Sequence, residues 1–353
     1  MKYKILVVAG GTGGHIIPAC NLLENLYKDN AISSYNPILI TDKKFNNYCI
    51  HKNKIKNIKY LDIYSRQTGI FKYCSSIFIQ TIKMIIFILR NKVKLVIGFG
   101  GYSSFPTLLA AFILRKKIIL HDSNSKIGKV NKLFSKYATY LCTMYPFNNN
   151  YKNFLRIGTP IDNNFSSTIY LLLKEKFVIY VTGGSQGARF FKNIIPDVIL
   201  KLSHHKKIKI IHQCRVNEEE YLKDKYASMN IDHEVSSFFS NVLEIMKESH
   251  LIITRAGAGT IAEIATIGRP AIYIPLPSAS DNHQYYNAKY IDDSNAGILV
   301  EEKDFNIDLF VEKIILLIGD DKKLLSISEN IKSLFKNEDC SNQFIKIIKE
   351  SLF

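Results

Sequence analysis

VVAGGTGGH, at residues 7–15, places four glycines between a short apolar run and a helical pattern. A second stretch, VIYVTGGSQGA at residues 178–188, has the same context half a chain later. Glycines at a strand-to-helix turn let the backbone approach a phosphate closely, and the helix N-terminus offers unpaired N–H groups and a partial positive charge. Together the two turns predict two nucleotide-binding-type domains with a cleft between them.

Length and charge are consistent with this organisation. The chain has 353 residues, enough for two domains of ordinary size. Its formal net charge of +16 suits anionic partners such as membrane headgroups, nucleic acid or phosphorylated substrates. The lysines are scattered through a chain rich in Ile, Lys and Asn, so a compositional bias of the genome explains the charge equally well.

Cysteine usage and the N-terminus indicate the compartment. The six cysteines are widely spaced and form no Cys-x-x-Cys pair, which argues against zinc and redox motifs. A reduced, cytoplasmic compartment fits best. An expected strand at residues 4–9 starts almost at the N-terminus, with no signal peptide ahead of it.

The apolar stretch at residues 71–89 looks like a transmembrane segment by composition. Lys83 would lie well inside the span, and a central lysine costs a few kcal/mol on insertion. We therefore expect a buried domain helix. A transmembrane span is the alternative. A separate hypothesis is that residues 70–73 with Lys83 and Arg90 form an apolar-basic patch lying on a membrane surface, for which an ordinary solvated rim is the alternative.

Strand-like runs alternate with helix-like segments throughout, which predicts doubly wound α/β domains. The expected strands are continuously apolar, as suits burial on both faces of a parallel sheet. The first series is 4–9, 36–40, 93–98 and 117–121, with helices at 18–27, 74–90 and 106–114; the second is 176–181, 208–213, 251–254 and 270–274. The segment Gly158-Thr159-Pro160 falls between the series and is the expected linker, and the tail from about residue 322 is helical.

Several glycine-rich or polar motifs follow the expected strands. They are GFGGY at 98–102, HDSN at 121–124 and RAGAGT at 255–260. Ligands of open α/β sheets bind outside the carboxyl ends of the strands. These motifs therefore predict a site in the cleft between the domains.

Taken in order, the motifs resemble those of the MurG family, the cell-wall transferases that move N-acetylglucosamine (GlcNAc) from UDP-GlcNAc onto lipid I to give lipid II. The resemblance rests on GGTGGH at 10–15, GGY at 100–102, HDSN at 121–124, GGSQGA at 183–188, residues 255–263 with Gly268 and Pro270, and residues 281–288. It implies the GT-B fold: two Rossmann-like, doubly wound parallel-sheet domains facing a central cleft. It also implies a role in peptidoglycan synthesis, and hence in cell shape and division.

The resemblance implies a division of labour between the domains. Residues 1–159 would form an N-terminal acceptor and membrane-associating domain, to which residues 337–353 return. Residues 160–336 would form the C-terminal UDP-GlcNAc donor domain.

In the donor domain the resemblance implies that Ser185 meets the phosphates of UDP-GlcNAc. Phe238 and Phe239 would line the uracil pocket, and Gln284 would contact the sugar near Asn287. The other expected donor contacts are Ala258, Gly259, Thr260, Ile261, Ala262 and Glu263. A carboxylate at Glu263 can accept hydrogen bonds from both ribose hydroxyls, although an ordinary helix N-terminal acid favoured by the dipole is the alternative.

In the acceptor domain Thr12, Gly13 and Gly14 would approach the acceptor diphosphate or the transferred sugar, and Asn124 would bind a GlcNAc hydroxyl. His15 is the candidate general base, because its ordinary pKa lies near neutrality. Orienting a phosphate and a purely structural role are the alternatives for His15.

The sequence departs from the family at three places. Asp122, a weaker catalytic candidate, stands where the family usually has Glu. Asp162 stands where the family's linker commonly has an arginine that can meet the donor diphosphate, and Arg156 or Arg255 would have to compensate. Gly259 replaces a larger residue, which loosens the loop entropically.

The implied reaction inverts the anomeric carbon: the C4 hydroxyl of the acceptor's N-acetylmuramyl residue attacks C1 of GlcNAc, and UDP leaves. Helix N-termini and backbone amides would stabilise the departing diphosphate. The sequence has no Asp-x-Asp, which favours a route with no metal, and magnesium held by water or by the substrate is the alternative. No cofactor is expected. The expected partners are UDP-GlcNAc, lipid I, an anionic membrane surface and other cell-wall synthesis proteins, but not nucleic acid. The enzyme would be peripheral on the cytoplasmic face of the bacterial inner membrane.

Four alternatives remain at this level. One is a GT-B enzyme with another lipid acceptor, such as diacylglycerol, and a second is a UDP-GlcNAc epimerase. A third is a nicotinamide-dependent oxidoreductase in which Asp42 binds ribose, although GTGGHI at 11–16 lacks the third glycine of the fingerprint. The fourth is a non-catalytic lipid-diphosphate-binding protein, suggested by Asp122 and Asp162.

Overall fold

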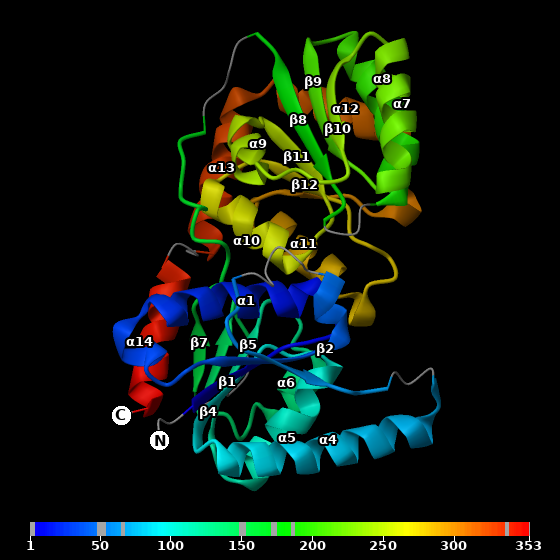
Figure 1. Cartoon of the computed structure of the whole chain (residues 1–353). Helices are drawn as coiled ribbons and strands as arrows, with labels where there is room; N and C mark the ends of the chain where they lie inside the picture. Colours follow the sequence, from blue (N-terminus) through cyan, green and yellow to red (C-terminus); the bar gives the residue numbers. More distant parts are fainter. Residues whose placement is uncertain are drawn as a thin grey trace. The chain divides into compact units, whose positions relative to one another are not determined.

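The computed structural model describes residues 4–47, 54–64, 68–147, 153–170, 175–184, 188–335 and 339–352. The chain forms two compact units (Figure 1). Unit 1 consists of Met1–Asn163 and Asn337–Phe353, and unit 2 consists of Asn164–Lys336.

Unit 1 contains, in its described residues, a seven-stranded parallel sheet of order β3-β2-β1-β4-β5-β6-β7. Its strands are β1 (Lys4–Val8), β2 (Ile38–Asp42), β3 (Ile58–Leu61), β4 (Val93–Gly98), β5 (Lys117–Asp122), β6 (Tyr140–Thr143) and β7 (Phe154–Arg156). The strand order reverses between β1 and β4, which makes the carboxyl ends of these two strands the topological switch point of the sheet.

Helices cover both faces of this sheet (Figure 1). The helical segments are α1 (Gly13–Lys28), α2 (Asn30–Ser33), η1 (Lys43–Asn47), α4 (Ile70–Arg90), η3 (Tyr102–Ser104), α5 (Phe105–Ile113), α6 (Lys129–Phe134) and α14 (Cys340–Leu352). One hydrophobic cluster joins α1 and α14 to the sheet, and another joins α4, α5 and α6 to its opposite face.

The last helix, α14, completes the core of unit 1. Phe344, Ile347 and Ile348 are buried in the cluster that contains β1 and β4 side chains. The Phe344 ring stacks on Phe99 with centroids 5.9 Å apart. At its surface Lys349 Nζ lies 2.7 Å from Asp29 Oδ2, so both apolar and charged contacts hold α14 in place.

Unit 2 contains, in its described residues, a six-stranded parallel sheet of order β10-β9-β8-β11-β12-β13. Its strands are β8 (Phe177–Thr182), β9 (Ile208–Gln213), β10 (Asp232–Ser236), β11 (Leu251–Thr254), β12 (Ala271–Tyr273) and β13 (Ile298–Leu299). Its helical segments are α7 (Arg189–Ser203), η4 (Val216–Glu218), α8 (Glu219–Ser228), α9 (Val242–Glu248), α10 (Ala258–Ile267), η5 (Ser280–Asn282), α11 (His283–Asp293), η6 (Glu302–Asp304), α12 (Ile307–Ile318) and α13 (Asp321–Phe335).

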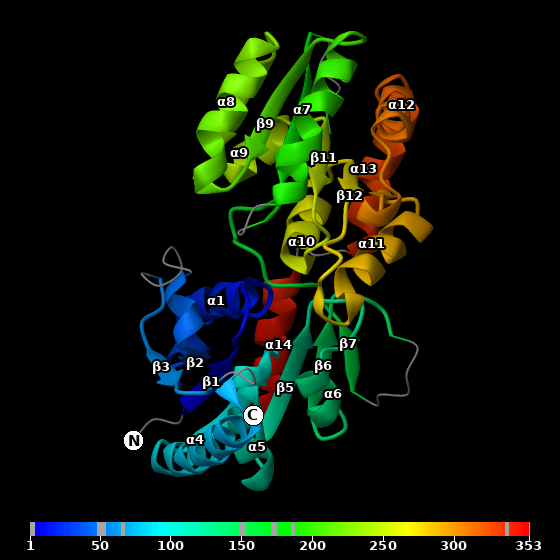
Figure 2. The same cartoon turned by 90° about the vertical axis from the view of Figure 1, so that its right-hand side faces the viewer.

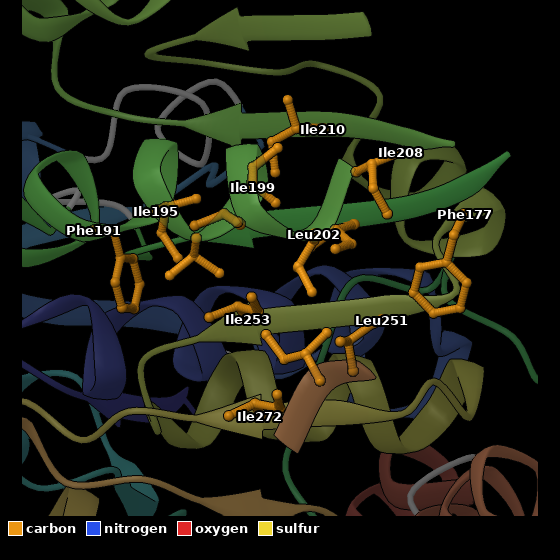
Figure 3. Close-up of a cluster of buried hydrophobic side chains, with 14 of the residues drawn as sticks. Phe177, Phe191, Ile195, Ile199, Leu202, Ile208, Ile210, Leu251, Ile253 and Ile272 are labelled. Atoms are coloured by element: carbon orange, nitrogen blue, oxygen red, sulfur yellow. The ribbon is translucent and has the colours of Figure 1, made fainter. Parts of the chain in front are cut away.

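The core of unit 2 lies between α7 and the sheet. Figure 3 shows Ile195, Ile199 and Leu202 of α7 directed toward Ile253 and its neighbours on the central strands. Figure 2 shows α7 and α8 together beside β9. The α7 positions repeat every three or four residues, which is the spacing that buries one face of a helix.

The expected strands are present, with ends that differ by at most two residues, and five further strands were not anticipated. Those five are β3, β6, β7, β10 and β13. They are short, and β10 alternates exposed Asp232 and Glu234 with less exposed residues, so they lack the continuous apolar run of a buried strand.

The expectation of a buried helix at 71–89 is wrong. The helix α4 is long and apolar enough to cross a membrane by length and composition, yet only 28% of its apolar window is buried in unit 1. Phe71 is 89% exposed and Phe78 is 67% exposed. The face that packs inward includes Ser76 and Gln80, whose side chains donate to the carbonyl oxygens of Tyr73 and Asp62, so hydrophobicity does not mark the buried face.

Candidate functional site

The first glycine-rich turn of unit 1 interlocks with the loop after β4. A Cβ built on Gly101 would lie 2.0 Å from the carbonyl oxygen of Gly10, and one built on Gly10 would lie 1.6 Å from Ser103 Oγ. No side chain fits in either place. These glycines are therefore required by the packing of one loop on the other at the switch point of the sheet.

Asp42, at the end of β2, holds this turn. Its Oδ2 accepts a hydrogen bond from the Gly11 N–H at 2.9 Å, and its Oδ1 accepts one from the Lys44 N–H at 2.9 Å. The Asp42 carboxylate is buried, and each of its oxygens already accepts a hydrogen bond from the backbone. The geometry therefore removes the basis of the oxidoreductase alternative, in which Asp42 would bind a ribose.

The N-terminus of α1 begins directly after the turn. Thr12 is the N-cap, but its described side chain forms no capping hydrogen bond, and the first turn contains no acidic residue. Gly13 and Gly14 are the first two residues of the helix. The first N–H groups of a helix lack intrahelical partners, so this end favours an anion.

His15 stands in the first turn of α1. Its Nδ1 lies 3.2 Å from Thr12 Oγ1, and its ring lies against the Gly100 backbone, where a Cβ would come within 3.3 Å of Cδ2. When Nδ1–H donates to the Thr12 hydroxyl, Nε2 carries the lone pair, which is the tautomer a general base needs. The structure thus brings together Thr12, the glycine turn and His15, as the sequence predicts.

Asp122 organises the loop that follows β5. Its carboxylate accepts hydrogen bonds from the Gly128 N–H at 2.8 Å, from Asn131 Nδ2 at 3.0 Å and from the Asn124 N–H at 3.2 Å. The residue is 3% exposed. This geometry supports a positioning role for Asp122 beneath Asn124 and gives no support to direct catalysis.

His121 is a residue of this motif to which the sequence analysis assigned no role. Its Nε2–H donates to the carbonyl oxygen of Gly158 at 2.8 Å, and its ring contacts Phe99 and Phe344. Burial lowers the pKa of His121 to about 4, so it is neutral at pH 7. His121 therefore fixes the segment that begins at Gly158 on unit 1.

Asp162, which departs from the family pattern, forms an ion pair with Lys54. Lys54 Nζ lies 3.3 Å from Asp162 Oδ2 and 3.4 Å from Glu24 Oε1. The arginine expected from the family at position 162 would place a second positive charge beside Lys54. Lys54 thus neutralises the acid where the family has a base.

The idea that Arg255 supplies the missing cation is wrong. Arg255 is 8% exposed and forms an ion pair with Glu302. Its guanidinium also donates to the carbonyl oxygens of Ile274 and Pro275 at 3.0 and 3.2 Å. Its hydrogen bonds hold the loop after β12 in place.

In unit 2 the helix α10 starts at the carboxyl end of β11. Gly257 is its N-cap, so no side chain caps the first turn. A Cβ built on Gly257 or Gly259 would meet no described atom within 4 Å. The helix end is therefore both uncapped and open, which are the properties of an anion-binding or ligand-binding helix N-terminus.

Two of the predicted donor-contact residues on α10 do not present their side chains to a ligand. Ile261 and Ala262 are fully buried, and the Ile261 N–H already donates to the Gly257 carbonyl oxygen within the helix. Ala258 is also buried, at 5% exposure. Gly259, Thr260 and Glu263 are less buried and remain on the open side of the helix.

Asn287 supports the turn ahead of α10. It is fully buried, and its Nδ2 donates to the Ala256 carbonyl oxygen at 3.1 Å. Burial argues against the predicted sugar contact and makes Asn287 a positioning residue. Gln284 is half-buried, and its Oε1 accepts from the Leu276 N–H at 3.0 Å, which ties α11 to the loop after β12.

The predicted base-binding segment follows β10. Phe238 is 56% exposed and Phe239 is half-buried, so neither is a core residue. Ser185 lies outside the described residues. The segments after β10, β11 and β12 all lie at one edge of the unit 2 sheet, because the carboxyl ends of parallel strands share an edge.

Comparison with known proteins identifies the family. Residues 5–143 match the model of the glycosyltransferase family 28 N-terminal domain, and residues 178–344 match that of its C-terminal domain. A protein of Rickettsia canadensis (strain McKiel) named UDP-N-acetylglucosamine–N-acetylmuramyl-(pentapeptide) pyrophosphoryl-undecaprenol N-acetylglucosamine transferase is 36% identical over 339 residues, covering 93% of this chain and 94% of its own. The protein of the same name from Rickettsia prowazekii (strain Madrid E) is 35% identical over 93% of this chain. This chain belongs to the MurG family.

Solved structures agree with the predicted fold. The crystal structure of Acinetobacter baumannii MurG has a TM-score of 0.84 and 23% identity, with 99% of both chains covered. The UDP-GlcNAc 2-epimerase of Neisseria meningitidis has a TM-score of 0.68 and 16% identity, which shows a common fold alone. The predicted GT-B fold, the MurG resemblance and the glycosyltransferase class are therefore confirmed.

Proposed function

We propose that this chain transfers GlcNAc from UDP-GlcNAc to the C4 hydroxyl of the N-acetylmuramyl residue of lipid I, giving lipid II. The observation that carries this is the identity of 36% over 93% of the chain to relatives named for that transfer. The structure adds an uncapped helix N-terminus at the carboxyl edge of each sheet, α1 in unit 1 and α10 in unit 2.

Unit 2 would hold the donor. Glu263, on the open side of α10, would accept hydrogen bonds from the ribose hydroxyls. Phe238 and Phe239 would contact the uracil, and Thr260 and Gly259 would lie beside the nucleotide. In the reaction the bond between C1 of GlcNAc and the diphosphate oxygen breaks, and UDP leaves with the electron pair. Helix N-termini and backbone amides aimed at the diphosphate stabilise the charge that develops on it.

Unit 1 would hold the acceptor. The α1 N-terminus at Gly13 and Gly14 would bind the acceptor's diphosphate or the transferred sugar, and Asn124 would bind a sugar hydroxyl. His15 Nε2 would take the proton of the C4 hydroxyl as its oxygen forms the bond to C1. Replacing His15 with Gln is expected to lower kcat ~100-fold or more while the KM for UDP-GlcNAc stays within about 3-fold.

The exposed face of α4 supports peripheral membrane binding. Besides Phe71 and Phe78 it presents Ile79, Ile82, Ile86 and Leu89, and its charged residues Lys72, Lys83 and Arg90 are exposed with them. The helix α5 packs beside α4, and its end together with α6 and the residues after it adds exposed Phe112, Ile113, Leu133 and Tyr137. An apolar surface with basic residues suits the anionic cytoplasmic leaflet of the inner membrane.

Vesicle sedimentation tests this surface. Phe78→Ser together with Ile82→Ser is expected to weaken binding to phosphatidylglycerol vesicles ~10-fold or more, because two apolar side chains that would be buried in the membrane are lost. Leu309→Ser on α12, which is 64% exposed, is the matched control and is expected to change nothing. Equal binding by the double variant and the wild type would contradict the membrane role of α4.

The transferase assignment is tested by UDP release from UDP-GlcNAc with and without a short-chain lipid I analogue, each repeated with EDTA. Release that needs the analogue and persists in EDTA is the expected result. Release without acceptor would point to an epimerase or hydrolase. Intact UDP-GlcNAc binding without release would favour another lipid acceptor or a non-catalytic binding protein.

A further inference from the structure

Gln213, the last residue of β9, links three strand ends of unit 2 through one side-chain amide. Its Oε1 accepts hydrogen bonds from Tyr180 Oη at 3.0 Å and from Thr182 Oγ1 at 2.8 Å, both on β8. Its Nε2 reaches the carbonyl oxygen of Ser237, just after β10, at 3.5 Å. Tyr180 and Thr182 are buried at 1% and 3% exposure.

The donor and acceptor roles in this hydrogen-bond network are fixed by the groups that form it. A carbonyl oxygen only accepts, so both hydroxyls donate to Gln213 Oε1, and the amide nitrogen is left to donate to Ser237. The opposite amide orientation would place two oxygens against each other at Ser237. The Thr182 hydroxyl donates its hydrogen to Gln213, and its oxygen can still accept a hydrogen bond. The Gly184 N–H donates to this oxygen at 3.1 Å.

At Thr182 the network holds the second glycine turn through the Gly184 N–H. Gly184 adopts φ +74°, a left-handed conformation that favours glycine, and its N–H is held by Thr182. The turn consequently leaves β8 in a conformation that depends on Thr182, and through it on Gln213.

At Ser237 the network holds the backbone that leads into Phe238 and Phe239. Ser237 lies between Ser236 and Phe238, which exchange two hydrogen bonds: Ser236 Oγ donates to the Phe238 carbonyl oxygen, and the Phe238 N–H donates back to Oγ. The Ser237 N–H donates to the Glu219 carboxylate. The bend before Phe238 is thus anchored on both sides, with Gln213 as one anchor.

The sheet itself does not connect these two segments. The strands β8 and β10 are not neighbours, since β9 lies between them. The last backbone hydrogen bond beside Gln213 runs from the Cys214 N–H to the Ser236 carbonyl oxygen at 3.1 Å, and it ties the β9 end to β10 but not to β8. Beyond these residues, a side chain from the middle strand is what joins the outer two. Gln213 stands in that position.

The hydroxyl of Tyr180 also responds to the charge of Glu263, the residue predicted to bind the ribose. Burial raises the pKa of the Tyr180 hydroxyl, and the negative charge of Glu263 raises it further. Tyr180 and Thr182 are two residues apart on β8 and share one face of the strand.

We propose that Gln213 is a positioning residue that fixes the Gly183–Gly184 turn relative to the Phe238–Phe239 segment, and so makes base recognition and diphosphate recognition act together on one nucleotide. The inference rests on the proposed function, which assigns the donor UDP-GlcNAc to unit 2. A nucleoside diphosphate that contacts both segments gains affinity only when their spacing is set before binding.

The test compares uridine, which carries the base and ribose, with UDP, which adds the diphosphate. Calorimetry on the whole chain gives the ratio of the Kd for uridine to the Kd for UDP. Gln213→Leu removes all three hydrogen bonds at similar volume, and we expect it to lower this ratio about 10-fold while the Kd for uridine changes less than about 3-fold. Tyr180→Phe, which keeps the links to Thr182 and Ser237, is expected to lower the ratio less than about 3-fold.

Thr182→Val provides a second route if Gln213→Leu does not fold. It cuts only the link to the glycine turn and is expected to lower the same ratio. A folded variant that weakens uridine and UDP equally, or neither, would overturn the positioning role. A wild-type chain that binds no UDP would overturn the donor assignment itself and the inference with it.

Discussion

The glycine-rich turns of unit 1 and unit 2 have similar sequences but different surroundings. In unit 1 a Cβ on Gly10 or Gly101 would collide with protein at 1.6 and 2.0 Å. In unit 2 a Cβ on Gly184, Gly257 or Gly259 would meet no described atom within 4 Å. Gly10 and Gly101 are thus required by protein packing, whereas Gly257 and Gly259 leave space that a ligand can use. Gly184 is favoured by its backbone φ of +74° rather than by its surroundings. A motif shows that a small residue is needed, and the structure shows what needs it.

The largest effect is expected from Gly101→Ala in unit 1. The new methyl would meet the Gly10 carbonyl in a backbone with φ +83°, so both strain and overlap oppose it. We expect a loss of at least ~3 kcal/mol in the unfolding free energy of unit 1, measured by denaturant titration with hydrogen exchange to resolve the units. Full stability in this variant would show that the two loops can separate without cost.

Paired substitutions of two acids sharpen the comparison. Glu263→Gln in unit 2 is expected to weaken UDP binding ~10- to 30-fold with little change in stability, because a charged acceptor of ribose hydroxyls is lost. Asp42→Asn in unit 1 is expected to do the reverse, since its carboxylate holds the Gly11 and Lys44 N–H groups. Calorimetric UDP binding and thermal unfolding of both variants measure the contrast. Unchanged affinity in Glu263→Gln would remove Glu263 from the site.

Gly259→Ala asks whether a ligand uses the open space on α10. Glycine inside a helix costs about 1 kcal/mol relative to alanine, and no described atom opposes a methyl here. We expect the unfolding free energy of unit 2 to rise by about 0.5–1 kcal/mol and UDP affinity to fall. Thr266→Ala, buried on the same helix, serves as a control for changes in α10 that do not face the open side. Equal or tighter UDP binding by Gly259→Ala would mean that the ligand does not approach this position.

The smallest effect concerns pH. Burial lowers the pKa of His212 in unit 2 to about 3 and that of His121 in unit 1 to about 4, so the folded units favour neutral histidine. Their contribution to stability is complete above the unfolded pKa of about 6.5 and is lost as pH falls toward the folded values. At pH 6 each histidine is expected to remove about 0.8 kcal/mol relative to pH 8.

Unfolding of His212→Gln at pH 6 and pH 8 checks this expectation, with the exposed His205→Gln as control. The first variant should lose part of the pH dependence of unit 2, and the control should keep all of it. Identical pH dependence in both variants would show that the pKa of His212 is the same in the folded and the unfolded chain.

The central strands could be predicted from sequence because strands buried on both faces carry continuous apolar runs. The edge strand β10 could not, since water covers Asp232 and Glu234 and removes the apolar signal. For α4 the apolar composition was visible, but which face packs inward depends on polar contacts to the segment after β3, where Gln80 donates to the Asp62 carbonyl oxygen and Ser76 accepts from the Tyr64 N–H. No hydrophobic pattern contains these contacts.

The position of the candidate site was predictable from motifs at strand ends, but the direction of single side chains was not. Ile261 and Ala262 were predicted to contact the donor because they stand in the same motif as Glu263. On the helix, however, their side chains point into the core. The residues missed, His121 and Gln213, carried one usable signal: each is a polar residue near the carboxyl end of a predicted apolar strand. What they bind lies on other strands and is set by the tertiary fold.

The return of α14 to unit 1 has a consequence for biosynthesis. The ribosome makes the sheet of unit 1 first, but Phe344, Ile347 and Ile348 of its core are made only after the whole of unit 2. Unit 2 is continuous in sequence and can close while the chain is still attached. The unit that is synthesised first is therefore completed after the second, and while unit 2 is being made the apolar face beside Phe99 lacks the helix that covers it.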